Sequence, residues 1–165
     1  MTTQPSARPL LVFEGADLRV VLLVLGRAGG SLPERDHLDA ELVVETSFVT
    51  GRQSLVLTPA DLDAWGSCLD ALSQGVDEVS WLDDGRSPGV SILRSKAPDV
   101  LDGPDGEEAA IQVTAHNAAA DVLVSTWLVP QLGWVRDLKG RLADVRSAWP
   151  RQERVSEHTY QWRRA

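Results

Sequence analysis

The chain has 165 residues, a formal net charge of −8 and one cysteine. A chain of this length fits one domain and can bury enough surface to fold without a metal, and one cysteine excludes an intramolecular disulfide. Because nucleic acids are bound largely through Lys and Arg contacts to phosphate, the acidic balance argues against a nucleic-acid partner and favours a basic protein.

The two ends of the chain are predicted to lie outside the folded domain. Residues 1–8 are polar, contain Pro5 and lack hydrophobic periodicity, which indicates a disordered N-terminus. They do not have the pattern of a signal peptide, and the apolar run at 20–25 is too short to span a membrane. We therefore expect a cytoplasmic protein with one domain at residues 9–150 and a flexible tail at 151–165.

The first half of the domain carries four predicted strands. Residues 10–13 and 18–25 are rich in apolar residues and predict a hairpin. Alternation of apolar and polar residues at 37–48 predicts a half-buried third strand, and a turn at 50–52 leads to a fourth at 54–57. The core of this half is predicted to contain Leu42, Val44, Phe48, Leu55, Leu57, Leu62, Trp65 and Leu69.

A helix is predicted at residues 59–74. Thr58 is suited to the N-cap, and Pro59 is suited to the first helical position. Asp61 places negative charge near the exposed N–H groups of the first turn, and Gly75 can cap the C-terminus.

The second half repeats the pattern of strands followed by a helix. Strands are predicted at 76–82, 89–94, 109–115 and 122–128. A second helix is predicted to start at Pro130 and to end before Pro150, with an apolar stripe formed by Leu132, Val135, Leu138, Leu142, Val145 and Trp149. The sequence therefore predicts an α+β fold, in which a curved antiparallel sheet of about eight strands in the order ββββαββββα carries two packed helices.

Acidic residues gather on the third predicted strand. Asp39, Glu41 and Glu45 alternate with apolar positions and should face outward together, and Asp36 lies nearby. Such carboxylates can serve acid–base chemistry or bind a hard metal, or they can form a solvated sheet face. A docking surface for a basic partner is the further interpretation, and on it Asp36, Asp39, Glu41 and Glu45 are the partner-binding residues.

Other polar residues do not form a recognisable catalytic or metal motif. His37, His116 and His158 are far apart in the sequence, and none belongs to a His-x-x-x-His pair. Cys68 lies in the middle of the first helix, where a small buried thiol is expected rather than a nucleophile. The segment 83–86 lacks the downstream ligands of a calcium loop and predicts a turn. No catalytic residue, metal site or cofactor is predicted.

The six tryptophans leave a ligand cavity open as an alternative. Trp65 and Trp149 fall on the apolar stripes of the two helices and should be core residues. The sequence does not decide whether Trp81, Trp127 and Trp134 line the core or a small-molecule cavity.

Several segments resemble a group of actinobacterial proteins described as a domain of unknown function. They are residues 38–45 (LDAELVVE), 48–52 (FVTGR), 55–65 (LVLTPADLDAW), 81–86 (WLDDGR) and 148–150 (AWP). The order of elements is also similar to that of immunity proteins paired with wall-associated polymorphic toxins of the WapA kind. That second resemblance implies a cytoplasmic protein that binds and blocks a toxin, and neither resemblance supplies catalytic residues.

Two functional hypotheses follow. The leading one is a non-catalytic protein-binding domain, specifically an immunity protein that blocks a basic toxin. The alternative is a small enzyme or ligand-binding protein of bacterial specialised metabolism, whose curved sheet encloses a Trp-lined cavity. The sequence does not indicate an oligomeric state.

Overall fold

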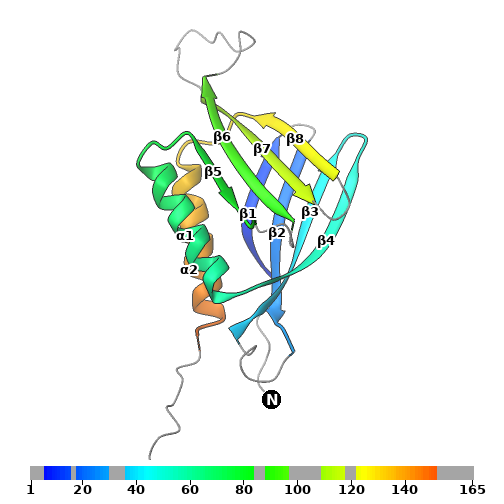
Figure 1. Ribbon diagram of the computed structural model, residues 1–165, viewed down its shortest axis with the longest axis vertical. Coiled ribbons are helices and arrows are strands. Elements are labelled where there is room, and N and C mark those ends of the chain that lie inside the picture. Colours follow the sequence, from blue (N-terminus) through cyan, green and yellow to red (C-terminus); the bar gives the residue numbers. More distant parts are fainter. Residues whose placement is uncertain are drawn as a thin grey trace, which may run out of the picture.

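The computed structural model describes residues 6–15, 18–29, 36–83, 88–96, 109–117 and 122–151. The first five elements are β1 (Arg8–Gly15), β2 (Leu18–Arg27), β3 (Leu38–Thr46), β4 (Thr50–Leu57) and α1 (Pro59–Ser73). The second five are β5 (Glu78–Trp81), β6 (Gly89–Lys96), β7 (Ala109–Asn117), β8 (Val122–Leu128) and α2 (Trp134–Ala148) (Figure 1). Most of the two predicted flexible ends lies outside the described residues.

The eight strands form two four-stranded antiparallel sheets. Sheet A has the order β1-β2-β3-β4 and sheet B the order β5-β6-β7-β8. The α+β class, the antiparallel pairing and the order ββββαββββα are confirmed. The division into two sheets refines the single curved sheet expected from the sequence. It arises where α1 separates β4 from β5, because the chain leaves one sheet through a helix instead of a hairpin.

The two sheets share one core, which the helices close on one side. α2 packs on β1, α1 packs on β5, and the helices contact each other. In Figure 1 the helices lie on the side of β1 and β5, whereas β4 and β8 lie on the opposite side. Apolar side chains from both sheets and both helices belong to one continuous cluster. Neither described helix is long and apolar enough to cross a membrane.

Two tryptophans in contact, with their rings tilted by 36°, join α1 to sheet B. Trp65 of α1 is fully buried and Trp81 of β5 is 2% exposed, with ring centroids 4.8 Å apart. The indole N–H of Trp81 donates a hydrogen bond of 2.8 Å to the Asp61 carbonyl oxygen in the first turn of α1. A large apolar contact and a directed hydrogen bond therefore fix the helix on the sheet.

The start of α1 follows the prediction. The Thr58 hydroxyl oxygen accepts a hydrogen bond of 3.2 Å from the Asp61 N–H, and the Asp61 carboxylate accepts one of 2.7 Å from the Thr58 N–H. This capping box satisfies two N–H groups that have no partner within the helix. Gly75, expected beyond the C-terminal end, has a φ of +88°, which glycine adopts at little cost.

Two predictions were wrong: Phe48 was predicted to lie in the core and Leu132 on the apolar stripe of the second helix, and both are exposed. Phe48 is 88% exposed because β3 ends at Thr46, whose hydroxyl oxygen accepts the N–H of Val49 at 2.9 Å and closes a turn at 47–49. Leu132 is fully exposed because α2 begins at Trp134, not at Pro130.

A charged cluster fixes the end of α2 to the start of α1. The Asp63 carboxylate accepts hydrogen bonds from Arg146, at 3.0 Å, and from Arg151. The same two guanidinium groups donate to the carbonyl oxygens of Leu62 and Pro59, at 3.2 and 2.9 Å. The hydrogen bond from Arg151, with the positive charge of both arginines, lowers the pKa of Asp63 below its ordinary value of 3.8.

We predict that Asp63→Asn lowers the free energy of unfolding at neutral pH by less than about 1 kcal/mol, because exposed ion pairs are screened by solvent. Since the pKa of Asp63 is lowered in the folded state, this stabilisation is present above the ordinary pKa. It is lost as the pH falls through the folded value.

The measurement is urea unfolding of the wild type and the variant at decreasing pH. The difference between the two proteins should shrink toward zero at acid pH, while Asp144→Asn, at an exposed position of α2, gives the control. A difference that stays constant down to the most acid condition would show that the ion pairs are not its source.

We also predict that Gly89→Ala destabilises the fold. Gly89 of β6 lies opposite His116 of β7, and a Cβ at Gly89 would lie 2.0 Å from Cε1 of the imidazole. Displacing the ring should lower the free energy of unfolding, measured in urea, by about 1–3 kcal/mol. The double variant Gly89→Ala, His116→Ala should recover most of the loss. Gly51→Ala is the matched control, because a Cβ on this strand glycine meets no atom within 4 Å.

Candidate functional site

The three acidic residues predicted on β3 share the outer face of sheet A. Leu38, Ala40, Leu42 and Val44 point into the core, so the alternating residues Asp39, Glu41 and Glu45 point away from it. Asp39 is exposed, and the side chains of Glu41 and Glu45 are 25% and 34% exposed. The structure therefore brings these three carboxylates together.

Two arginines and a fourth carboxylate complete this surface. Arg19 of β2 lies between Glu14 of β1 and Glu45 in the strand register, with N–O distances of 3.1 and 3.4 Å. Arg52 of β4 reaches Glu41 at 3.5 Å and Glu45 at 3.8 Å. We call Glu14, Arg19, Asp39, Glu41, Glu45 and Arg52 the acidic surface. Glu14 is not among the predicted site residues, although its position near the end of β1 could have indicated that it faces a cross-strand neighbour on β2.

Arg52 also explains why Val43 is buried although it lies on the outer face of sheet A. Val43 lies between Glu41 and Glu45 on β3 and directly opposite Arg52 on β4, yet it is only 4% exposed. Because Arg52 reaches carboxylates on both sides of Val43, its aliphatic stem lies over the valine. Arg52 therefore packs on the sheet in addition to neutralising charge.

Asp36 lies apart from the acidic surface. Its carboxylate accepts a hydrogen bond of 3.1 Å from Arg27, whose guanidinium also donates to the Pro150 carbonyl oxygen. Asp36 lines a hollow of about 320 Å³ together with Asp63 and Trp149. The structure thus groups Asp36 with the residues around the end of α2. The sequence could not show this, because Arg27 and Pro150 are far apart along the chain.

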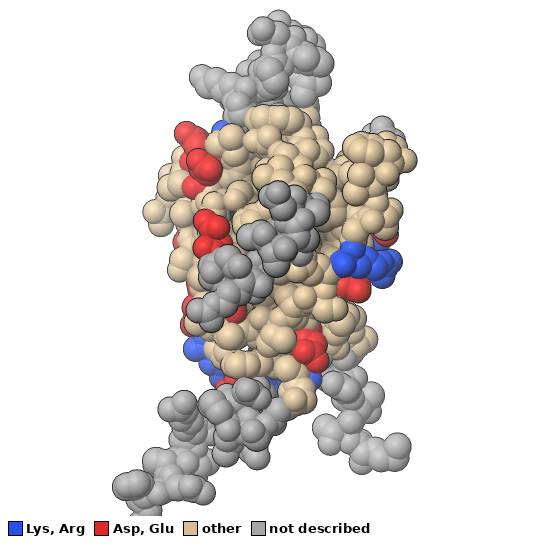
Figure 2. Space-filling view, turned by 45° about the vertical axis from the view of Figure 1, so that its right-hand side comes forward, with Lys and Arg blue, Asp and Glu red and all other residues tan. Residues whose placement is uncertain are grey.

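The outer face of sheet B has a different character. Its strand register aligns Ser80, Ser91, Thr114 and Ser125 in one row across all four strands. The Ser80 and Ser91 hydroxyls are 3.0 Å apart, and those of Thr114 and Ser125 are 2.9 Å apart. Figure 2, which turns the side of β4 and β8 forward, shows broad uncharged areas between scattered acidic and basic side chains.

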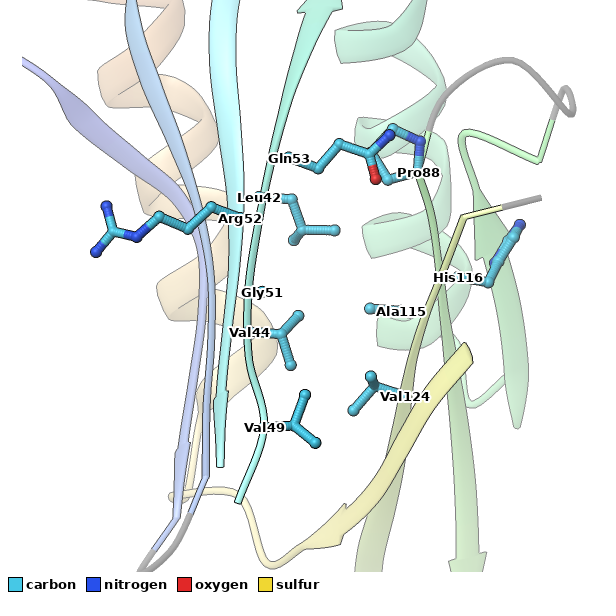
Figure 3. A pocket seen from close by; sticks show the side chains of 10 residues that line it. All are labelled: Leu42, Val44, Val49, Gly51, Arg52, Gln53, Pro88, Ala115, His116 and Val124. Atoms are coloured by element: carbon cyan, nitrogen blue, oxygen red, sulfur yellow. The ribbon is translucent and has the colours of Figure 1, made fainter. Parts of the chain in front are cut away.

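An apolar cavity of about 200 Å³ lies between the two sheets on the side of β4 and β8. Five aliphatic side chains line it from opposite sides in Figure 3, namely Leu42, Val44 and Val49 with Ala115 and Val124. Arg52 and His116 border the cavity but turn their side chains away from it. The volume is below the roughly 300–1,000 Å³ of most small-molecule pockets, and its described lining contains no tryptophan.

The tryptophans of undecided orientation take three different positions. Trp81 lies in the core. Trp134 is half-buried at the start of α2, with its ring 5.8 Å from that of Phe13 and 5.4 Å from the guanidinium carbon of Arg94. Trp127 of β8 is 45% exposed on the outer face of sheet B.

The remaining candidate groups stand singly among the described residues. The part of the chain that the structure describes has no group of three or more His, Cys, Asp or Glu side chains placed to hold a metal ion. His116 Nε2 lies 3.7 Å from an oxygen of Asp83, and burial raises the pKa of the Cys68 thiol above 9.0. A raised pKa makes a thiol a poor nucleophile at neutral pH. His158 and residues 84–86 lie outside the described residues.

Comparison with known proteins places the chain in a family. No curated protein matches its sequence. A solved structure described as the plant transcriptional regulator PBF-2 aligns with a TM-score of 0.49 and 11% identity, over 89% of this chain and 84% of that chain. No statement about function follows from a likeness at that level. A family model matches residues 8–150, which include every element of the fold, and the chain therefore belongs to the family of unknown function DUF5959.

Proposed function

We propose that this chain is a non-catalytic protein-binding domain that docks a basic partner on its acidic surface. One observation carries the proposal: four carboxylates stand in strand register on one face of sheet A with only two guanidinium groups among them. The strands hold these groups at fixed positions, so a partner would meet a preformed pattern of charge. Such complementarity raises association rates and selects partners.

Basic groups of a partner can replace Arg19 and Arg52 in their ion pairs with the carboxylates. Arg19 and Arg52 have side chains that are 51% and 61% exposed, and three of their four ion-pair distances are 3.4 Å or longer. Exposed pairs of this kind contribute only about 0.2–1 kcal/mol, so Lys or Arg residues of a partner can replace them at low cost.

Apolar groups beside the acidic surface suit the same role. Val56 of β4 lies opposite Asp39 in the register and is 47% exposed, and Leu25 of β2 is 45% exposed. Protein interfaces combine a buried apolar centre with a polar rim. A basic partner would therefore find apolar contact area next to the carboxylates.

More specifically, we propose that the partner is a basic toxin and that the chain is a cytoplasmic immunity protein. The net charge of −8 and the acidic surface support a basic partner. The choice of a toxin as the partner comes from the resemblance to WapA-type immunity proteins that the sequence suggests.

The test is to search the genes next to this one for a basic toxin-like protein and to co-express that protein with the chain. We expect a complex and protection of the host cell. The variant Asp39→Asn, Glu41→Gln, Glu45→Gln should weaken the complex at least about tenfold, and high salt should do the same to the wild type. The control variant Asp77→Asn, Glu78→Gln, Asp144→Asn changes the net charge equally at exposed positions elsewhere. Equal weakening by both variants would refute the acidic surface as the site.

The apolar cavity favours the second candidate function, a ligand-binding protein or small enzyme. Its aliphatic lining would suit a small apolar group but contains no tryptophan, whereas Trp127 lines the larger open groove beside β8. Ala115→Leu narrows this cavity without changing charge. Under the leading proposal it leaves partner binding and protection intact. A loss of function by Ala115→Leu, but not by the carboxylate variant, would favour the ligand-binding candidate instead.

A further inference from the structure

Among the residues that the structure describes, β8 is an edge strand without the usual protection against pairing. It is the last strand of sheet B, bonded to β7 on one side, and no described strand pairs with its other side. Its seven residues, VLVSTWL, include no charged residue and no proline, and its register with β7 is unbroken. Exposed strand edges act as templates for another strand, so monomeric proteins usually protect them with charge, proline, bulges or a covering element.

The other three sheet edges each have such a device. β1 carries Pro9 and a register shift beside it, and α2 packs on this strand. β5 is only four residues long and is covered by α1. β4 carries Arg52, whose guanidinium pairs with two glutamates of β3. β8 is thus the bare edge among the four.

From this contrast we propose that two copies of the chain form a symmetric dimer by antiparallel pairing of their β8 edges. The proposal goes beyond the binding of a basic partner, because it uses a different sheet. An isologous contact requires a surface that is complementary to itself under a two-fold rotation.

The side chains of β8 meet that requirement. With the two-fold axis at Ser125, Trp127 of each copy lies opposite Leu123 of the other on the outer face, and Val124 lies opposite Thr126 on the inner face. Trp127 and Leu123 are 45% and 65% exposed in the single chain. An aromatic residue opposite an aliphatic one is a favourable cross-strand pair.

The distribution of charge is compatible with a second copy at this edge, whose β8 is complementary to itself. Two copies with a net charge of −8 repel each other, so they can associate stably only through a surface with little charge. The rows of sheet B that lead to β8 provide one, because the row Ser80, Ser91, Thr114 and Ser125 would continue through Ser125 into the same row of the partner copy. A basic partner gains nothing from this face.

An open groove lies beside this edge. A groove of about 770 Å³ lies between β8 and the β3–β4 turn. Val124 and Thr126 border it and are only half-buried, and Phe48 at its rim is 88% exposed. In the dimer, β8 of the second copy lies about 4.8 Å from β8 of the first and covers part of this apolar surface.

The first experiment compares molar mass by light scattering and sedimentation equilibrium over a range of protein concentrations. The wild type should reach twice the chain mass of 17.9 kDa. Ser125→Lys places two like charges opposite each other at the axis and should give a monomer with unchanged circular dichroism. Ser54→Lys, the same change at an exposed position of the β4 edge, should remain a dimer. A monomeric wild type, open-ended oligomers or a dimeric Ser125→Lys variant would overturn the proposal.

The second experiment tests the register and does not depend on how Ser125→Lys folds. Residues opposite each other in antiparallel strands have Cα atoms about 4.5–5.5 Å apart, which suits a disulfide. Ser125→Cys should therefore form a covalent dimer under mild oxidation, at least about tenfold faster than Ser54→Cys or the wild type with its Cys68. Equal rates for all three proteins would exclude this pairing. The variant Asp39→Asn, Glu41→Gln, Glu45→Gln should stay dimeric. Loss of partner binding can therefore be distinguished from loss of the β8 dimer.

Discussion

The contact between Trp81 and the first turn of α1 is the joint on which the fold depends. Among the described residues the two sheets share no strand pairing, so no ladder of hydrogen bonds connects one half of the molecule to the other. Apolar packing and the helices connect them: α2 packs on β1, and in α1 Trp65 packs against Trp81 while the Asp61 carbonyl accepts the indole N–H. The capping box at Thr58 and Asp61 fixes the same turn from the other side. One helical turn thus orients sheet B relative to the end of sheet A.

This joint makes the molecule asymmetric. The helices close the space between the sheets on the side of β1 and β5, and the charged cluster around Asp63 holds them together there. On the other side, β4 and β8 face solvent without a helix, and the small apolar cavity lies between them. The β8 edge and the apolar cavity are accessible on this open side, whereas the acidic surface lies on the outer face of sheet A.

How far the sequence predicts this structure depends on the range of the interaction involved. Alternation along β3 correctly places Asp39, Glu41 and Glu45 outward, because facing is a local property of a strand. Alternation wrongly placed Phe48 in the core, because β3 ends at Thr46, whose hydroxyl closes a turn that contains Phe48. The pairing of Asp36 with Arg27 is non-local, and the meeting of Arg27 with Pro150 depends on where α2 ends. The division into two sheets is likewise invisible to periodicity, because each strand has the same pattern in one sheet or in two.

The outer face of sheet A is charged and the outer face of sheet B is largely uncharged, so the two faces can bind different partners independently. Sheet A carries carboxylates and arginines whose cross-strand pairs also cover Val43, while the outer rows of sheet B consist largely of hydroxyl, amide and apolar side chains. A strand added at β8 extends sheet B within its own plane and leaves the outer face of sheet A untouched. Two-fold pairing at β8 would therefore present two acidic surfaces in a fixed relation to each other. Such an assembly could engage two basic sites at once, and the second contact would form at a high effective concentration set by a rigid sheet instead of a flexible linker.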